Sequence, residues 1–164
     1  MQPHRTDLAG VSIRPAVRAD LPALADLWFA FETWLNGLEA EPEPVDRAKF
    51  EGFEALAFGT RPACAVLLAE DGDRAIGYLV HYPGVWMDDM APCLHVADLF
   101  VRPDNHRQGV GRALMQAARH IASDAGAAHM FWTVWRDNPQ AKAFYERLGA
   151  EVFDEEILMK WPVR

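Results

Sequence analysis

The chain has 164 residues, 51% of them hydrophobic and 24% charged, which is typical of a single globular domain. Its net charge of −8 argues against a nucleic-acid-binding protein, because such proteins normally present a basic face. Two cysteines, Cys64 and Cys93, are too few for a disulfide framework or a metal site, and no apolar run approaches the roughly 20 residues of a membrane span. We therefore expect a cytoplasmic protein with reduced thiols, no metal and no membrane partner.

Strand and helix signals follow one another after a leader at residues 1–10. The first half predicts a strand at 11–14, a helix at 21–35 capped by Asp20, a polar linker at 39–44, a helix at 46–58, and strands at 63–69 and 74–82 joined by an Asp71-Gly72 turn. The second half predicts a loop at 83–93, a strand at 94–101, a helix at 109–125, a strand at 129–135, a helix at 138–149 and one or two strands within 151–161. This order predicts one α/β (α+β) domain over 11–164, with a mixed, mostly antiparallel central sheet of six to seven strands and helices on both faces.

The segment 98–112, DLFVRPDNHRQGVGR, carries the strongest chemical signal. Gly109 and Gly111 open a long helix, whose first turns present unpaired N–H groups and the positive end of the helix dipole. Glycine leaves room for an anion to approach these groups, and Arg107 and Arg112 add positive charge. The segment therefore predicts a phosphate or pyrophosphate site, although the glycines alone are also compatible with a tight strand-to-helix turn.

Three spaced motifs, LHVADLFVRP, RQGVGRALM and WTVWRDNPQAKAFYERLGAE, together resemble the GNAT superfamily of N-acetyltransferases. Within it, the chain is most similar in character to the diamine and thialysine N-acetyltransferases. The resemblance implies a GNAT-like domain and an enzyme that transfers acetyl from acetyl-CoA to an amine. In place of the usual Arg or Gln of the family, this chain has His106.

The resemblance also implies roles for individual residues. The backbone of Leu99, Phe100 and Val101 would bind the pantetheine arm, as would Asn138. The pyrophosphate would lie on the N–H groups of the turn formed by Arg107, Gln108, Gly109, Val110, Gly111 and Arg112. Tyr145 would protonate the departing thiolate, although residue pattern alone also fits a packed helix aromatic beside Phe144.

On the acceptor side, the diamine branch has a Glu-Asp pair where this chain has Ala97-Asp98. The Asp is kept as a candidate catalytic residue, and the missing carboxylate leaves the general base open. Regular alternation would place His95, Ala97 and Leu99 on one face, so His95 is a candidate replacement for the base. A structurally hydrogen-bonded histidine is the alternative.

Two acidic segments, 28–45 and 83–93, are expected to flank the acceptor. Glu32, Asp88 and Asp89 are the candidate substrate-binding residues, with ordinary surface charges as the alternative. Because neither segment contains Lys or Arg, we expect a small cationic acceptor with a primary amine and a second cationic group. The alternatives are a protein or peptide amine, an aminoglycoside, or a non-catalytic acyl-CoA-binding module. We also expect a homodimer.

Overall fold

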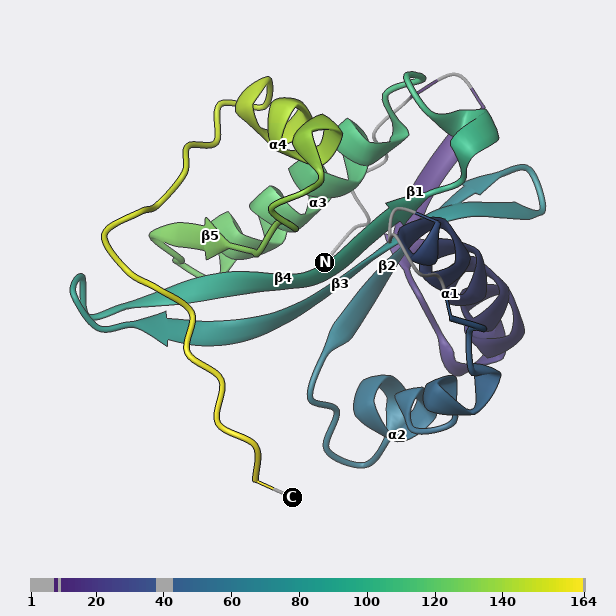
Figure 1. Ribbon diagram of the computed structural model, residues 1–164, viewed down its shortest axis with the longest axis horizontal. Helices are drawn as coiled ribbons and strands as arrows, with labels where there is room; N and C mark the ends of the chain where they lie inside the picture. The colour runs from purple at the N-terminus through teal and green to yellow at the C-terminus, as the bar shows by residue number, and fades with distance from the viewer. Residues whose placement is uncertain (1–7, 9, 38–42, 164) are drawn as a thin grey trace. The chain divides into compact units, whose positions relative to one another are not determined.

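The structure is a computed structural model that describes residue 8, residues 10–37 and residues 43–163. Five strands form one mixed sheet in the order β1-β2-β3-β4-β5 (Figure 1). The strands are β1 Val11–Pro15, β2 Ala65–Asp71, β3 Arg74–Trp86, β4 Ala91–Val101 and β5 His129–Phe131. Successive strands pair antiparallel from β1 to β4, whereas β4 and β5 pair parallel. The predicted mixed α/β sheet is confirmed. Most of the predicted leader and part of the linker, including Glu39 and Glu41, lie outside the described residues.

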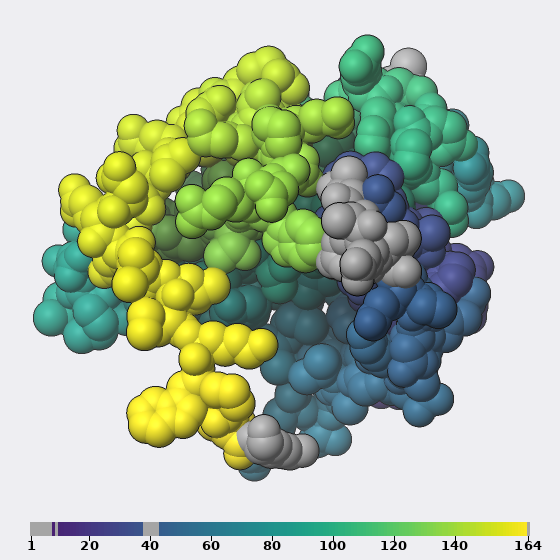
Figure 2. Space-filling model, viewed as in Figure 1, coloured from purple at the N-terminus to yellow at the C-terminus, as the bar shows by residue number. Residues whose placement is uncertain are grey.

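The predicted count of six to seven strands is wrong, because residues 151–163 form no strand. The side chains of these residues lie on the surface in Figure 2 (yellow), and Ile157, Leu158 and Trp161 are 81%, 85% and 90% exposed. The segment thus has the apolar residues of a strand but no described partner strand to satisfy its backbone. The strand predicted at 129–135 is likewise shorter, since only His129–Phe131 pairs with β4.

Helices account for most of the remaining elements. They are the short 3-10 turns η1 Arg18–Asp20, η2 Arg47–Phe50 and η3 Pro103–Asn105, and the α-helices α1 Leu21–Asn36, α2 Phe53–Phe58, α3 Val110–Asp124 and α4 Pro139–Glu146. The single helix predicted over 46–58 is interrupted, because Asp46 caps η2 through the Ala48 N–H and a turn at Glu51-Gly52 separates η2 from α2. No helix of the described chain is long and apolar enough to cross a membrane.

The chain divides into two compact units, Met1–Trp132 and Thr133–Arg164. The first contains the sheet and all the helices except α4, which belongs to the second. In the first unit both faces of the sheet are buried, since the neighbouring residues Leu67 and Leu68, which point to opposite faces, are 4% and 0% exposed. Leu68 packs with Leu24 and Leu27 of α1, and α3 contacts β1 to β4 on the other face. The prediction of helices on both faces is confirmed for this unit.

The β3–β4 hairpin runs without interruption through Pro83 and Gly84, where the sequence predicted a loop from 83 to 93. Gly84 is in the strand for a packing reason. A Cβ atom there would lie 2.9 Å from Cδ2 of His95 and 3.0 Å from Sγ of Cys93. Glycine therefore marks a close contact between strands here rather than a turn.

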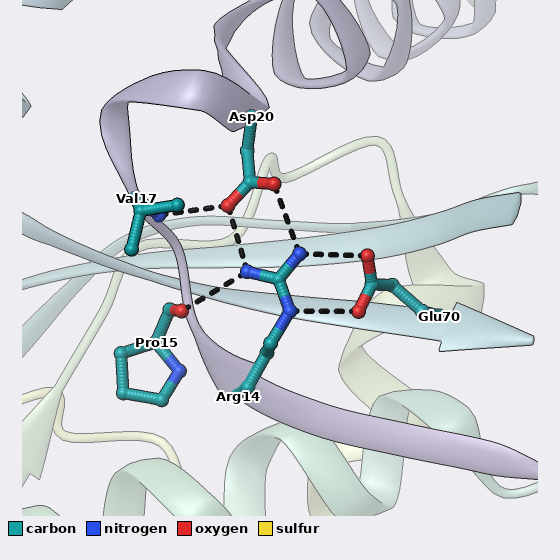
Figure 3. Close-up of polar contacts among 5 residues, drawn as sticks. All are labelled: Arg14, Pro15, Val17, Asp20 and Glu70. Atoms are coloured by element: carbon teal, nitrogen blue, oxygen red, sulfur yellow. Dashed lines mark hydrogen bonds and ion pairs between the residues drawn. The ribbon is translucent and has the colours of Figure 1, made fainter. Parts of the chain in front are cut away.

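An ion cluster joins β1, β2 and η1 (Figure 3). The Arg14 guanidinium donates to both carboxylate oxygens of Asp20, at 2.7 and 2.9 Å, and to both of Glu70, at 2.8 and 2.7 Å. Asp20 also accepts from the Val17 N–H at 2.7 Å. It occupies the predicted N-cap position of α1, but its side chain makes no cap hydrogen bond to that helix. The Arg14 hydrogen bonds hold the pKa of Asp20 below its ordinary value.

Replacing Arg14 by Met should lower the free energy of unfolding by about 1–3 kcal/mol at pH 7, because two largely buried carboxylates lose their donors. The deficit should shrink at acid pH, because the wild-type contribution is lost as pH falls through the lowered pKa of Asp20. Denaturant unfolding at pH 7 and pH 3 measures both effects. Arg18→Met is the matched control, because the side chains of Arg18 and its partner Glu54 are 59% and 50% exposed. This substitution should lower the free energy of unfolding by about 0.5 kcal/mol or less. Equal losses in the two variants would contradict the expectation.

Candidate active site

A cavity of about 510 Å³ lies in the first unit between α1, η2, α2 and the strands β3 and β4. Its walls are largely aromatic and aliphatic side chains. The lining residues are Leu24, Trp28, Phe50, Phe53, Leu56, Ala63, Cys64, Tyr78, Val80, Tyr82, Ala97 and Asp98. Its volume is within the range of about 300–1,000 Å³ that small-molecule sites occupy. Asp98 is the one residue with a carboxylate among the described lining residues.

Asp98 is held by Tyr78, which lies on the neighbouring strand. The Tyr78 hydroxyl donates a hydrogen bond of 2.5 Å to Oδ2 of Asp98. Burial raises the pKa of Asp98 from 3.8 to about 6, and the charge of Glu32 adds to this, whereas the Tyr78 hydroxyl and the Leu99 N–H oppose it. Burial and the Asp98 charge together raise the pKa of Tyr78 well above its ordinary value. Tyr78 thus stays protonated at neutral pH while Asp98 is a carboxylate close to its titration range.

A β-bulge at Ala97 decides which residues face the cavity. Val80 pairs with Asp98 and His81 pairs with Val96, so Ala97 is the extra residue of β4. His95 lies opposite Tyr82, and their rings stack at 5.0 Å between centroids. Because directly opposite residues share a face, His95 and Asp98 are on the same side of the sheet, the side of Tyr82 and Val80.

This bulge corrects the predicted alternation. Ala97 does line the cavity, but Leu99 pairs with Leu79 on the opposite face of the sheet. Asp98 faces the cavity, whereas regular alternation would place it on the other face. The His95 ring packs between Tyr82 and Phe131 and is not among the cavity-lining residues. The structure therefore brings Asp98, rather than His95, into the cavity.

β4 also has a free edge beside the cavity. β4 pairs with β5 only from Cys93 to His95. Beyond His95, no strand of the described chain pairs with the edge of β4 that faces away from β3. The backbone of Leu99, Phe100 and Val101 lies on this stretch and still pairs with β3 on its other side. An extended polar chain of a ligand would satisfy the free donors and acceptors.

The edge leads into the predicted phosphate turn. Gly109 precedes α3 with a φ of +90°, and Arg107 has a φ of +61°. His106 Nε2 lies 2.7 Å from the Val101 carbonyl oxygen and ties the turn to the end of β4. The first N–H groups of α3, a helix of 15 residues, are left without partners inside the helix.

The side chains around this turn differ in their surroundings. Arg107, Gln108 and Arg112 are exposed, so they are accessible to an anion, whereas Val110 is 1% exposed and offers only its backbone. A Cβ atom on Gly109 would lie 3.2 Å from a methyl group of Leu8. The left-handed backbone favours glycine at this position, and a larger side chain would also have to displace the end of Leu8.

The other predicted residues lie elsewhere. Asp88 and Asp89 are exposed at the tip of the β3–β4 hairpin, where Asp89 lies 2.8 Å from Nε2 of His129. Glu32 of α1 is half-buried and does not line the cavity, although its charge acts on Asp98. The structure thus brings together Asp98 and Ala97 but not the three acids predicted for the acceptor.

Asn138 and Tyr145 belong to the second unit. The Asn138 side chain accepts a hydrogen bond of 3.0 Å from the Ala141 N–H and so caps α4, as the Asn-Pro start of the helix predicted. Tyr145 is half-buried, with its ring edge-on to Phe144 at 5.0 Å. Their roles toward acetyl-CoA stay predictions.

The sequence did not indicate the hydrogen bond from Tyr78 to Asp98, because the two residues are 20 positions apart and meet only through the pairing of β3 with β4. Trp28, Phe50 and Phe53 also line the cavity, although their spacing within the helices predicted at 21–35 and 46–58 is that of ordinary packed residues. Among the described residues, no group of three or more His, Cys, Asp or Glu is placed to hold a metal ion.

The sequence model of the Acetyltransferase (GNAT) family matches residues 22–150. This chain belongs to that family. Its relatives include the uncharacterized N-acetyltransferase YhfO of Bacillus subtilis, 28% identical over 86% of this chain and 90% of that protein. They also include the peptidyl-lysine N-acetyltransferase YiaC of Escherichia coli, 26% identical over 92% of this chain and 97% of that protein. The acetyltransferase is therefore an enzyme of the acyltransferase class.

The fold of the acetyltransferase is similar to that of solved structures. The integron cassette protein VCH_CASS6 from the mobile metagenome of V. cholerae matches 93% of this chain and 93% of its own with a TM-score of 0.79 and 20% sequence identity. Together with the family match over residues 22–150, this similarity confirms the predicted GNAT-like fold.

Proposed function

We propose that this enzyme transfers the acetyl group of acetyl-CoA to the primary amine of a small cationic molecule by direct attack. The observation that carries the proposal is the position of Asp98. It lines the cavity, and it lies on the stretch of β4 that pairs with β3 but has no described strand along its opposite edge. A carboxylate whose pKa is about 6 can pair with an alkylammonium and accept a proton near neutral pH.

The residues present fit acetyl-CoA. The free edge at Leu99, Phe100 and Val101 supports binding of its amide-bearing pantetheine arm, and the N–H groups from Arg107 to Arg112 support binding of its pyrophosphate. Acetyl-CoA supplies the activated thioester carbon that the amine attacks. Family resemblance supports Asn138 as a further contact of the arm.

The chain's own groups would then handle the protons. The ammonium first loses a proton to water, so that a neutral amine attacks the thioester carbon. Asp98 accepts the second proton, which the nitrogen loses as its bond to carbon forms, and the Tyr78 hydroxyl fixes the orientation of the carboxylate. Tyr145, on the strength of the family resemblance, donates a proton to the sulfur that leaves. Both groups are suited to these steps, because a phenol is a donor at neutral pH and a carboxylate an acceptor.

Release of free CoA thiol from acetyl-CoA tests the proposal. A panel of diamines, monoamines, amino acids, lysine peptides and aminoglycosides should show amine-dependent release for small amines. Preferential release with lysine peptides or aminoglycosides would favour those acceptors. Binding of CoA without release for any amine would instead indicate a non-catalytic binding module.

Replacing Tyr78 by Phe tests the link between Tyr78 and Asp98. Loss of the hydroxyl removes a hydrogen bond that favours the ionised carboxylate, so the pKa of Asp98 should rise further above 6. The acid limb of the pH profile of kcat/KM should move to higher pH by the same amount. Tyr82→Phe is the matched control and should leave the limb in place, since no described hydrogen bond joins Tyr82 to Asp98. An unmoved limb in Tyr78→Phe would contradict the assignment of Asp98 as the base.

We further propose a cytoplasmic homodimer. The free cysteines Cys64 and Cys93 support a reducing compartment, and the exposed apolar side chains of Ile157, Leu158 and Trp161 support self-association. Light scattering of the full chain measures the mass, and a monomer at micromolar concentration would refute the dimer.

A further inference from the structure

We propose that the acceptor carries a single primary amine on an apolar body, so that this enzyme acts on lipophilic monoamines rather than on diamines. The inference rests on the proposed function and assigns the acceptor to the cavity beneath α1 and α2. It departs from the dication that the acidic composition of the flanking segments suggested.

The walls of the cavity support an apolar body. The ring centroids of Trp28 and Phe50 are 5.5 Å apart, and Phe50 stacks on Phe53 at 4.8 Å. The three rings form a continuous aromatic wall from α1 through η2 to α2. Leu24 of α1 and the β3 residues Tyr78 and Val80 are only 2–7% exposed. Burial raises the pKa of the Cys64 thiol, which therefore stays neutral. A ligand that displaces water from these walls gains by burying carbon, and a second ammonium would be desolvated there.

The charges of the cavity support one amine only. Asp98 is the one carboxylate among the described lining residues, and the Tyr78 hydroxyl already donates to it. Asp88 and Asp89 are at the exposed hairpin tip, and Glu32 does not line the cavity. A second cation inside the cavity would thus find no second carboxylate among the described lining residues to compensate for the water it loses, and Glu32 acts on Asp98 only from outside the lining.

The mouth of the cavity supports the same reading. Leu56 and Tyr82 are 51% and 39% exposed, and Ala63 and Ala97 are exposed as well, so the most exposed residues of the described lining are uncharged. Ala97, the extra residue of the bulge, stands beside Asp98 and adds only a methyl group. A substrate therefore meets an uncharged entrance with a carboxylate at one side.

The test compares hexylamine with 1,5-diaminopentane, which has the same number of heavy atoms but a second ammonium in place of the terminal methyl. We expect kcat/KM with acetyl-CoA to favour hexylamine at least tenfold, and to rise by about fourfold per methylene from propylamine to hexylamine. Equal or faster acetylation of the diamine would overturn the inference while leaving the proposed function intact. No acetylation of any amine would overturn both.

The cavity must also be distinguished from a site for the acyl chain. With propylamine as acceptor, acetyl-CoA should be used faster than hexanoyl-CoA. A faster reaction with hexanoyl-CoA would assign the apolar walls to the acyl group and overturn the inference.

Ala97→Glu provides an independent check within the same chain. The added carboxylate at the mouth should raise kcat/KM for 1,5-diaminopentane about tenfold or more relative to hexylamine, as expected for a charged hydrogen bond. The matched control is Ala65→Glu, an exposed strand position that does not line the cavity, which should keep the hexylamine preference. The same shift in both variants would show an effect of net charge alone and count against the cavity as the acceptor site.

Discussion

Asn in place of Asp98 should lower kcat by about 10²–10⁴-fold, the usual contribution of a general base, while acetyl-CoA binding changes little. The substitution keeps the shape of the side chain and the hydrogen-bond acceptor for Tyr78, but it removes the proton acceptor. Steady-state kinetics at pH 8 and CoA titration by calorimetry measure the two quantities. Asp88→Asn makes the same chemical change at the exposed hairpin tip and should keep wild-type kcat. A wild-type rate in Asp98→Asn would remove Asp98 from the mechanism.

The same variant has a second readout in stability. A pKa raised in the folded state means that the ionised carboxylate destabilises the protein, so the wild type loses stability as pH rises through the interval from about 4 to about 6. A shift from 3.8 to about 6 corresponds to about 3 kcal/mol at most. The stability of Asp98→Asn relative to the wild type should therefore increase as pH rises from 4 to 7. Chemical denaturation at several pH values measures this difference. A difference independent of pH would indicate an ordinary, solvated carboxylate.

Glu in place of Gly109 should weaken CoA binding by about 10–100-fold or more, because one or two charge-assisted hydrogen bonds to the pyrophosphate are lost and a negative charge is added. Part of the effect is conformational, since Gly109 has a φ of +90° and its Cβ would contact Leu8. Calorimetry with CoA measures the affinity.

Gly126→Glu is the matched control for this prediction. Gly126 lies beyond the other end of α3 with a φ of +70°, and a Cβ atom there meets nothing within 4 Å. Both variants should lose about 1–2 kcal/mol of stability through the left-handed backbone, but only Gly109→Glu should lose CoA affinity. Comparable affinity losses would assign the effect to helix stability rather than to a phosphate site.

The sequence predicted most elements because local signals and packing agree along much of the chain. The helix at Leu21–Asn36 has its apolar residues at helical spacing, and Leu24 and Leu27 are indeed buried. The Asp71-Gly72 turn and the Asn138-Pro139 helix start also follow from the chemistry of those residues. The segment from Leu99 to Arg112 was recognisable because strand, turn and helix are contiguous there.

The acceptor side was less predictable, because it depends on pairing between distant residues. Neither the bulge at Ala97 nor the hydrogen bond from Tyr78 to Asp98 has a local signature, and both arise from the register of β3 against β4. The glycine at 84 indicated a loop by composition, but the ring of His95 across the strand pair explains it. The predicted strands within 151–161 failed because alternation of apolar residues does not supply a partner strand.

The extra residue at Ala97 divides β4 into two parts, in which side chains alternate between the faces of the sheet in opposite phase. Up to His95, odd-numbered positions share the face of Tyr82, and from Asp98 onward that face belongs to the even numbers, Asp98 and Phe100. Substitution at Ala97 leaves this arrangement intact, whereas deleting the residue would require either Asp98 and Phe100 or His95 and Cys93 to change layers. An engineer who wishes to reshape the cavity can therefore vary the side chain at 97 freely but must preserve the length of the strand.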